Sequence, residues 1–259
     1  MPDLVGRIER DPFSASLSTL SHNLRVLELR GLVDLGCFER YEGDDLPWPN
    51  LESLMVMFWP VCPSGSWYFQ GPKGEGRHTK GYLIAEQHYP TLLPNTNDFV
   101  HDEYLKEHGR PGDNLIGGIG FRVRPNEETL VPFLTAFAKA AVRMPKLKDL
   151  NLWSPLIWYN NEDDIPADWL EYEHLNDRPL AWGLAYDKPT AKTPRKLTWR
   201  VSTWRPDDQL HTLFQDIGRQ EHGNELVEDW VDEQYGDNLV GREFFSDYEV
   251  LPSHSLPWH

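Results

Sequence analysis

The fold is decided by one stretch of sequence, Pro145-Lys146-Leu147-Lys148-Asp149-Leu150-Asn151-Leu152. Its apolar residues follow the pattern P-x-L-x-x-L-x-L, and two earlier segments repeat that pattern, at residues 22–29 and 49–56. Side chains alternate between the two faces of a strand, so the leucines point to one side and the residues between them to the other. The three segments therefore predict three strands that share one apolar face.

This spacing is typical of the strand core of a leucine-rich repeat. The repeat is irregular, because the position that should hold Asn or Cys is occupied by Leu32, Trp59 and Pro155. The copies are also unevenly spaced, 27 residues apart and then 96. We therefore expect an irregular leucine-rich-repeat-like domain of the α/β class, with an insertion at about residues 60–125.

The insertion is expected to begin with a β-hairpin. Residues 66–70 and 81–85 are rich in aromatic and β-branched side chains, and the glycine-rich residues 71–76 separate them. Residues 115–124 can contribute one more strand. On such a hairpin, Trp67, Tyr68 and Tyr82 would protrude.

Helices and strands alternate in the rest of the chain. Apolar residues at helical spacing predict helices over residues 129–144, 206–217 and 225–235, and strands are expected at 180–186 and 197–203. This alternation favours a partly parallel sheet with helices on one side. No linker divides the sequence, so residues 1–259 are expected to form a single domain.

Composition excludes several classes of function. The formal charge of −16 opposes binding to nucleic acid or anionic lipid, which requires excess Lys and Arg. Two cysteines, Cys37 and Cys62, cannot build a disulfide framework, and no apolar stretch is long enough to span a membrane. We expect an intracellular protein, cytoplasmic or nuclear, without a metal or a cofactor.

The predicted strands place a second set of side chains opposite the leucines. If the open side of the sheet is a binding surface, its contacts come from Glu28, Arg30, Met55, Met57, Asn151 and Trp153. Trp158 and Tyr159 can join them from the following loop. Tyr and Trp favour such surfaces because they offer large contact areas with few rotatable bonds. In contrast, Trp182, Trp199 and Trp230 are expected in the core.

Catalytic signatures are absent from the sequence, since it has no nucleophile elbow, zinc-protease motif, P-loop or dinucleotide fingerprint. The weak candidates are Asp149 and the neighbours Glu221 and His222. Adjacent residues on a helix point about 100° apart, however. The simpler interpretation of residues 219–223 is a helix end at which Gly223 adopts a left-handed conformation.

Several segments resemble the region that follows the F-box in a large group of fungal F-box proteins. In chain order they are Trp59 to Phe69, Phe133 to Ala141, Met144-Pro145, Leu152 to Leu156, Leu180 to Tyr186, Trp204 to Asp207 and Ile217 to Gly223. The resemblance extends from about Leu24 to about Leu239. It implies a repeat-like domain that presents substrates to a cullin-type ubiquitin ligase.

Residues 1–22 are too few for an F-box, so docking to the ligase adaptor is not implied. The first hypothesis is therefore an intracellular module that recognises a protein partner. The alternative is a cofactor-independent enzyme, an isomerase or cyclase, that holds a small molecule in an aromatic-lined pocket on the same scaffold. An enclosed aromatic pocket with a buried acid would favour the enzyme, and an open surface would favour partner binding.

Overall fold

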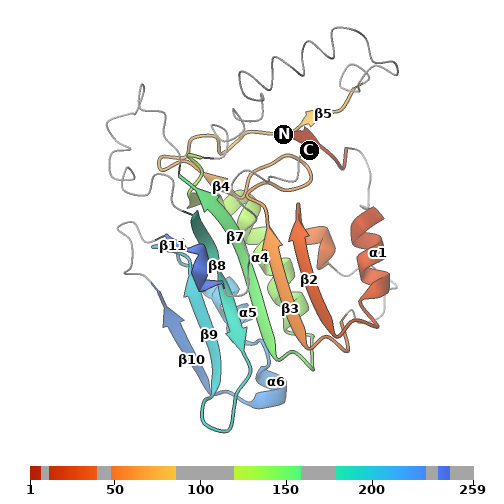
Figure 1. The fold of residues 1–259 in the computed structure, drawn as a ribbon, viewed down its shortest axis with the longest axis vertical. Coiled ribbons are helices and arrows are strands. Elements are labelled where there is room, and N and C mark those ends of the chain that lie inside the picture. Colours follow the sequence, from red (N-terminus) through yellow and green to blue (C-terminus); the bar gives the residue numbers. More distant parts are fainter. Residues whose placement is uncertain (7–11, 40–47, 86–119, 159–178, 232–238, 246–259) are drawn as a thin grey trace.

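The centre of the fold is a mixed β-sheet. The computed structural model describes residues 1–6, 12–39, 48–85, 120–158, 179–231 and 239–245. Within these residues, seven strands form the sheet in the order β10-β9-β8-β7-β3-β2, and β11 pairs with β8 (Figure 1). The strands are β2 (Val26–Gly31), β3 (Ser53–Phe58), β7 (Asp149–Ile157), β8 (Pro179–Asp187), β9 (Arg195–Arg200), β10 (Leu226–Trp230) and β11 (Val240–Gly241).

The three leucine segments form β2, β3 and β7, which are adjacent and parallel. Leu27, Leu54 and Leu150 are direct neighbours across these strands, and the next inward row is formed by Leu29, Val56 and Leu152. The prediction of neighbouring strands in register is therefore confirmed. The alternation of side chains was sufficient because an entire apolar row has to face one core.

Beyond β7 the sheet departs from a simple repeat. Strand β8 is antiparallel to both β7 and β9, and β10 is parallel to β9. Consequently β8 alone runs against the other strands. The predicted strands 180–186 and 197–203 correspond to β8 and β9, and the mostly parallel α/β architecture is confirmed.

The helices α4 (Glu127–Ala141) and α5 (Asp208–Gln215) lie on one face of the sheet (Figure 1). Helix α1 (Pro12–Leu20) lies beyond β2, and the short helices are η1 (Leu35–Cys37) and α6 (Arg219–His222). Asp207 caps α5, since its side chain accepts a hydrogen bond from the backbone N–H of Leu210 at 2.8 Å. The buried side chains of α4 and α5 complete the core against the leucine rows.

Aromatic rings fill the core between α4 and the sheet. Phe133 packs against Phe58 and Tyr68, with ring centroids 5.1 Å apart in both pairs. Phe137 meets Phe38 edge to face at 4.9 Å. Trp182 and Trp199 are fully buried, as expected, whereas Trp230 is half-buried at the edge of the sheet.

The predicted hairpin is wrong. Strand β4 (Phe69–Gln70) pairs with β6 (Arg124–Pro125), and β5 (Tyr82–Leu83) pairs with β1 (Pro2–Asp3). Each expected hairpin strand therefore binds a segment far away in the sequence. The local pattern marked the strands but contained no information about their partners. Of the expected strand at 115–124, residues 115–119 lie outside the described residues.

The predicted helix at 225–235 is also wrong. Residues 226–230 form the edge strand β10, with Leu226, Glu228 and Trp230 turned toward α5 and with Val227 and Asp229 exposed. Leu226 and Trp230 are four residues apart, a spacing that fits one face of a helix as well as one face of a strand. Pairing with β9 selects the strand.

Candidate functional site

The predicted contact residues come together on the face of the sheet opposite α4 and α5, which we call the helix-free face. Glu28, Met55 and Asn151 are direct cross-strand neighbours and form one row. Arg30, Met57 and Trp153 form the next row, toward the carboxyl ends of the parallel strands. All six residues predicted for this face therefore lie on it.

The part of the face near the amino ends of the parallel strands is polar. Asp149 accepts a hydrogen bond from the Ser53 hydroxyl, and Asp187 lies directly opposite Asp149 on β8. Burial and the neighbouring charge of Asp149 raise the pKa of Asp187, although Lys196 and Arg200 oppose this shift. Met55 and Asn151 are half-buried here, so their side chains remain accessible.

The part near the carboxyl ends is covered by residues 239–245, which we call the strap. It contains β11, the short helix η4 (Arg242–Phe244) and Phe245. The Phe245 ring stacks on Trp153 at 5.3 Å, with 11° between the ring planes. Trp153 and Met57 are 0% and 4% exposed, so the prediction that they are open contacts is wrong.

Two arginines hold the strap in place. Arg242 donates hydrogen bonds to the carbonyl oxygens of Leu180 and Leu156, at 3.1 and 3.2 Å. Arg200 donates to the carbonyl of Phe244, and its guanidinium lies over the Phe244 ring at 4.9 Å. The strap is thus anchored by polar contacts on both sides of the Trp153 stack.

The other predicted binding residues are scattered. Trp67 and Tyr68 are buried, since they are not on a protruding hairpin, and the Tyr68 hydroxyl donates to the Val33 carbonyl at 2.8 Å. Burial raises the pKa of Tyr68 well above its usual range. Trp158 is also buried, and Tyr82 is 51% exposed. Tyr159 lies outside the described residues.

The weak catalytic candidates do not form one site. Glu221 and His222 are exposed on α6, whereas Asp149 lies on the helix-free face. Gly223 follows α6 with φ of 85°, and its N–H donates to the Arg219 carbonyl. The interpretation of residues 219–223 as a helix end is therefore confirmed.

A cavity of about 260 Å³ lies beside the start of α4, and the sequence gave no sign of it. Its wall combines the segment after β9 with β4, β6 and the first turn of α4. The polar side chains that line it include Gln70, Arg77, Arg124, Glu127, Ser202 and Thr203, and Trp204 adds an indole ring. These residues are up to 134 positions apart along the chain, so no local motif could predict their meeting.

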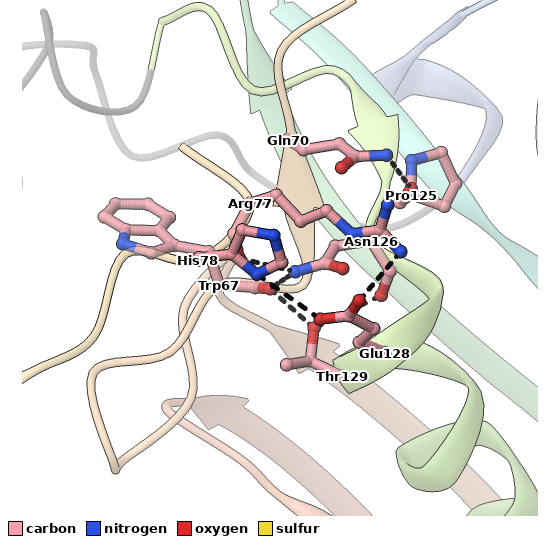
Figure 2. A network of polar contacts seen from close by, with 8 residues as sticks. All are labelled: Trp67, Gln70, Arg77, His78, Pro125, Asn126, Glu128 and Thr129. Atoms are coloured by element: carbon pink, nitrogen blue, oxygen red, sulfur yellow. Dashed lines mark hydrogen bonds and ion pairs between the residues drawn. The ribbon is translucent and has the colours of Figure 1, made fainter. Parts of the chain in front are cut away.

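A polar network fixes the wall of this cavity (Figure 2). The fully buried Asn126 donates from its amide to the carbonyls of Trp67 and Arg77, at 3.0 and 3.1 Å. Thr129 donates to the same Trp67 carbonyl at 2.6 Å, and Arg77 pairs with Glu128 at 3.0 Å. The loop that contains Arg77 is thereby attached to the first turn of α4.

Arg122 anchors the other side of this loop. Its guanidinium lies 4.1 Å from the centre of the Trp67 ring and donates to the carbonyls of Phe69 and Gly76, at 3.1 and 2.9 Å. Burial lowers the pKa of Arg122 to about 10. Because the side chain is 97% buried and tied to the backbone, we assign it a structural role.

Two atoms in the cavity wall have no hydrogen-bond partner among the described residues. They are Oε1 of Gln70, an acceptor, and Nε of Arg77, a donor. The amide of Gln70 is oriented, because its Nε2 donates to the Pro125 carbonyl at 3.0 Å. Buried polar groups are nearly always paired, so these two atoms are unusual features of the wall.

A second polar cluster lies between β10 and α5. Glu228 accepts hydrogen bonds from Trp199 at 3.0 Å and from Gln215, and it contacts His211 Nε2 at 2.7 Å. Burial alone raises the pKa of Glu228, but the contacts with His211, Gln215 and Trp199 lower it below the usual value. All of these groups are paired with one another, which favours a structural role.

No family model matches the chain, and no curated protein or solved structure matches it. The resemblance to fungal F-box proteins therefore stays a prediction. In the part of the chain that the structure describes, no helix is long and apolar enough to cross a membrane. Nor does that part contain three or more His, Cys, Asp or Glu side chains grouped as metal ligands.

Proposed function

We propose that this protein is a recognition module that binds a protein partner on its helix-free face. The observation that carries the proposal is the row formed by Glu28, Met55 and Asn151, which lies on regular strands and stays accessible. Side chains on paired strands are held in fixed positions, and rigid positioning reduces the entropic cost of binding. The expected role is the one implied by the fungal F-box resemblance, the selection of a protein substrate.

The chemistry of the face suits a protein surface. Met55 offers an adaptable apolar contact, Asn151 can donate and accept hydrogen bonds, and charged residues of both signs surround them. Pairs such as Lys196 with Asp229, at 3.2 Å, leave no single sign of charge dominant there. An apolar centre with a polar rim is the usual anatomy of a protein interface.

The enzymatic alternative receives less support. An isomerase or cyclase without a cofactor needs an enclosed aromatic pocket with a buried acid or base. The cavity beside α4 has Trp204 as its aromatic wall, and its carboxylate, Glu127, belongs to an exposed residue. This geometry supports partner binding over catalysis.

A photo-crosslinking experiment tests the proposal. Benzoylphenylalanine is placed at Met55, at Asn151 and, as a control, at Lys139, which is exposed on α4. In fungal extract, positions 55 and 151 should crosslink to the same protein and position 139 should not. Equal crosslinking from position 139, or no defined product from either test position, would overturn the proposal.

The purified crosslinked protein then provides a quantitative test. Asn151→Arg places a bulky charge at the centre of the row and should weaken binding at least tenfold, about 1.4 kcal/mol. Lys139→Glu should leave the affinity unchanged. Equal losses in the two variants would show that the helix-free face is not the contact surface.

A further inference from the structure

We propose that the cavity beside α4 binds a carboxamide group, the side chain of an asparagine or glutamine that belongs to the partner. This inference rests on the proposed function for the identity of the ligand's source. The cavity adjoins the covered part of the helix-free face, because Leu239 both lines the cavity and begins the strap. A partner that crosses the strap from the helix-free face therefore reaches it.

The two unpaired atoms define the chemistry of the ligand. Oε1 of Gln70 requires a donor, and Nε of Arg77 requires an acceptor. The remaining polar atoms of these side chains are engaged, since Gln70 Nε2 binds the Pro125 carbonyl and Arg77 pairs with Glu128. A carboxamide carries one acceptor oxygen and two donor hydrogens in a single plane, which matches both requirements.

The charges in the wall favour a neutral ligand. Arg77 and Arg124 contribute positive charge, while Glu127 lies in the wall and Glu128 pairs with Arg77. A carboxylate only accepts hydrogen bonds, so it would leave Gln70 Oε1 without a donor. An ammonium or amidinium group only donates, and it would face two arginines.

The size and shape of the cavity also fit a side chain. A volume of about 260 Å³ is below the usual range of roughly 300–1,000 Å³ for pockets that enclose a whole ligand. The Trp204 indole is held by a hydrogen bond to Glu127 at 3.1 Å and packs 5.5 Å from Trp182. It forms a fixed wall against which a planar amide can lie.

Binding requires only small movements of the wall. In the structure Gln70 Oε1 and Arg77 Nε are turned away from solvent. The last torsion of a glutamine side chain has a broad energy well, so a modest rotation turns its oxygen toward the cavity. The backbone on both sides stays fixed by the bonds from Asn126 and Arg122.

Three probes of equal shape test the inference: acetamide, acetate and acetamidinium. Each is titrated into the full chain while the Arg77 Nε–H and Gln70 amide signals are followed by ¹⁵N NMR. Acetamide should shift both signals saturably, with an apparent affinity at least tenfold above that of the other two. Equal responses to all three probes, stronger binding of either charged probe, or no response to acetamide would overturn the inference.

Two variants locate the response. Arg77→Lys keeps the charge beside Glu128 but removes the Nε–H, so the shift of Gln70 should be lost, whereas the control Arg143→Lys at the far end of α4 should keep it. Gln70→Glu replaces the orphaned amide oxygen by a carboxylate and should switch the preference to acetamidinium. An unchanged preference for acetamide in folded Gln70→Glu would contradict the inference.

The outcomes separate the two proposals. Acetamide binding without a crosslinked partner at positions 55 and 151 supports the cavity and refutes the recognition face. A crosslinked partner without acetamide binding supports the face and refutes the carboxamide site.

Discussion

Among single residues, Glu228 has the most closely specified surroundings. On the helix-facing side of β10, two nitrogen donors and His211 surround its carboxylate. An acid in such a position stabilises the fold only while it is ionised. Its contribution to stability must therefore depend on pH.

Glu228→Gln is expected to lower the free energy of unfolding by about 1–2 kcal/mol at pH 7, because the new amide NH₂ group faces a nitrogen donor. The folded pKa of Glu228 lies below its usual value of 4.5. The stabilisation is therefore complete above pH 4.5 and is lost as the pH falls through the folded pKa. Urea unfolding at pH 7 and pH 3 should show a difference between variant and wild type that shrinks in acid.

Glu225→Gln is the matched control, since Glu225 is exposed just before the same strand. It should change stability by less than about 0.5 kcal/mol at both pH values. A Glu228→Gln difference that stays constant or grows in acid would contradict this account of the cluster.

Among the elements, the strap has the smallest support. It pairs with β8 through two residues, and its buried side chains form a small cluster with Met57, Trp153 and Ala181 that is separate from the main core. An element with few buried contacts opens at a lower free energy than the rest of the molecule. Local opening of the strap is therefore expected before global unfolding.

Phe245→Ala should release the strap, because it removes the ring that stacks on Trp153. Truncation of a buried phenylalanine costs about 3 kcal/mol, which exceeds what a two-residue strand can supply. Hydrogen exchange at Val240 and Gly241 should accelerate at least tenfold, and binding of a hydrophobic dye should increase. Phe13→Ala, at a residue that is 48% exposed, should change neither.

The elements also show where sequence reasoning succeeds. The strands at residues 26–31, 53–58 and 149–157 were predictable, because alternating leucines define both the strand and its inward face. The strand at 226–230 and the partners of residues 69–70 and 82–83 were not. Those outcomes depend on contacts between segments that are distant in the chain, which local patterns do not encode.

In the whole molecule, one apolar core joins the ends of the described chain. The same cluster of buried side chains contains Leu17 of α1, the rows of the sheet and Leu239. Apart from the strap cluster, there is no break at which one part of the described core ends and another begins. Unfolding of this core is therefore expected to be cooperative.

The expected observation is a single transition. Tryptophan fluorescence, which reports on Trp182 and Trp199 in the core, and far-ultraviolet circular dichroism should give the same urea midpoint within error. Two separated midpoints would contradict the assignment of residues 1–259 to a single domain.

The candidate site was only half accessible to sequence reasoning. The row of Glu28, Met55 and Asn151 followed from strand alternation alone. The burial of Trp153 did not, because the residues that cover it are about 90 positions later. The cavity beside α4 was unpredictable for the same reason, since its wall is assembled from four separate segments.

The position of the strap at residues 239–245 also affects how the protein is made. Ribosomes build a chain from its amino end, so every other strand of the sheet leaves the exit tunnel first. During that interval an indole and a thioether on the growing sheet face water and can attract chaperones. A nonsense mutation before codon 239 would make this transient exposure permanent, and quality-control proteases would then read the finished sheet as a misfolded one.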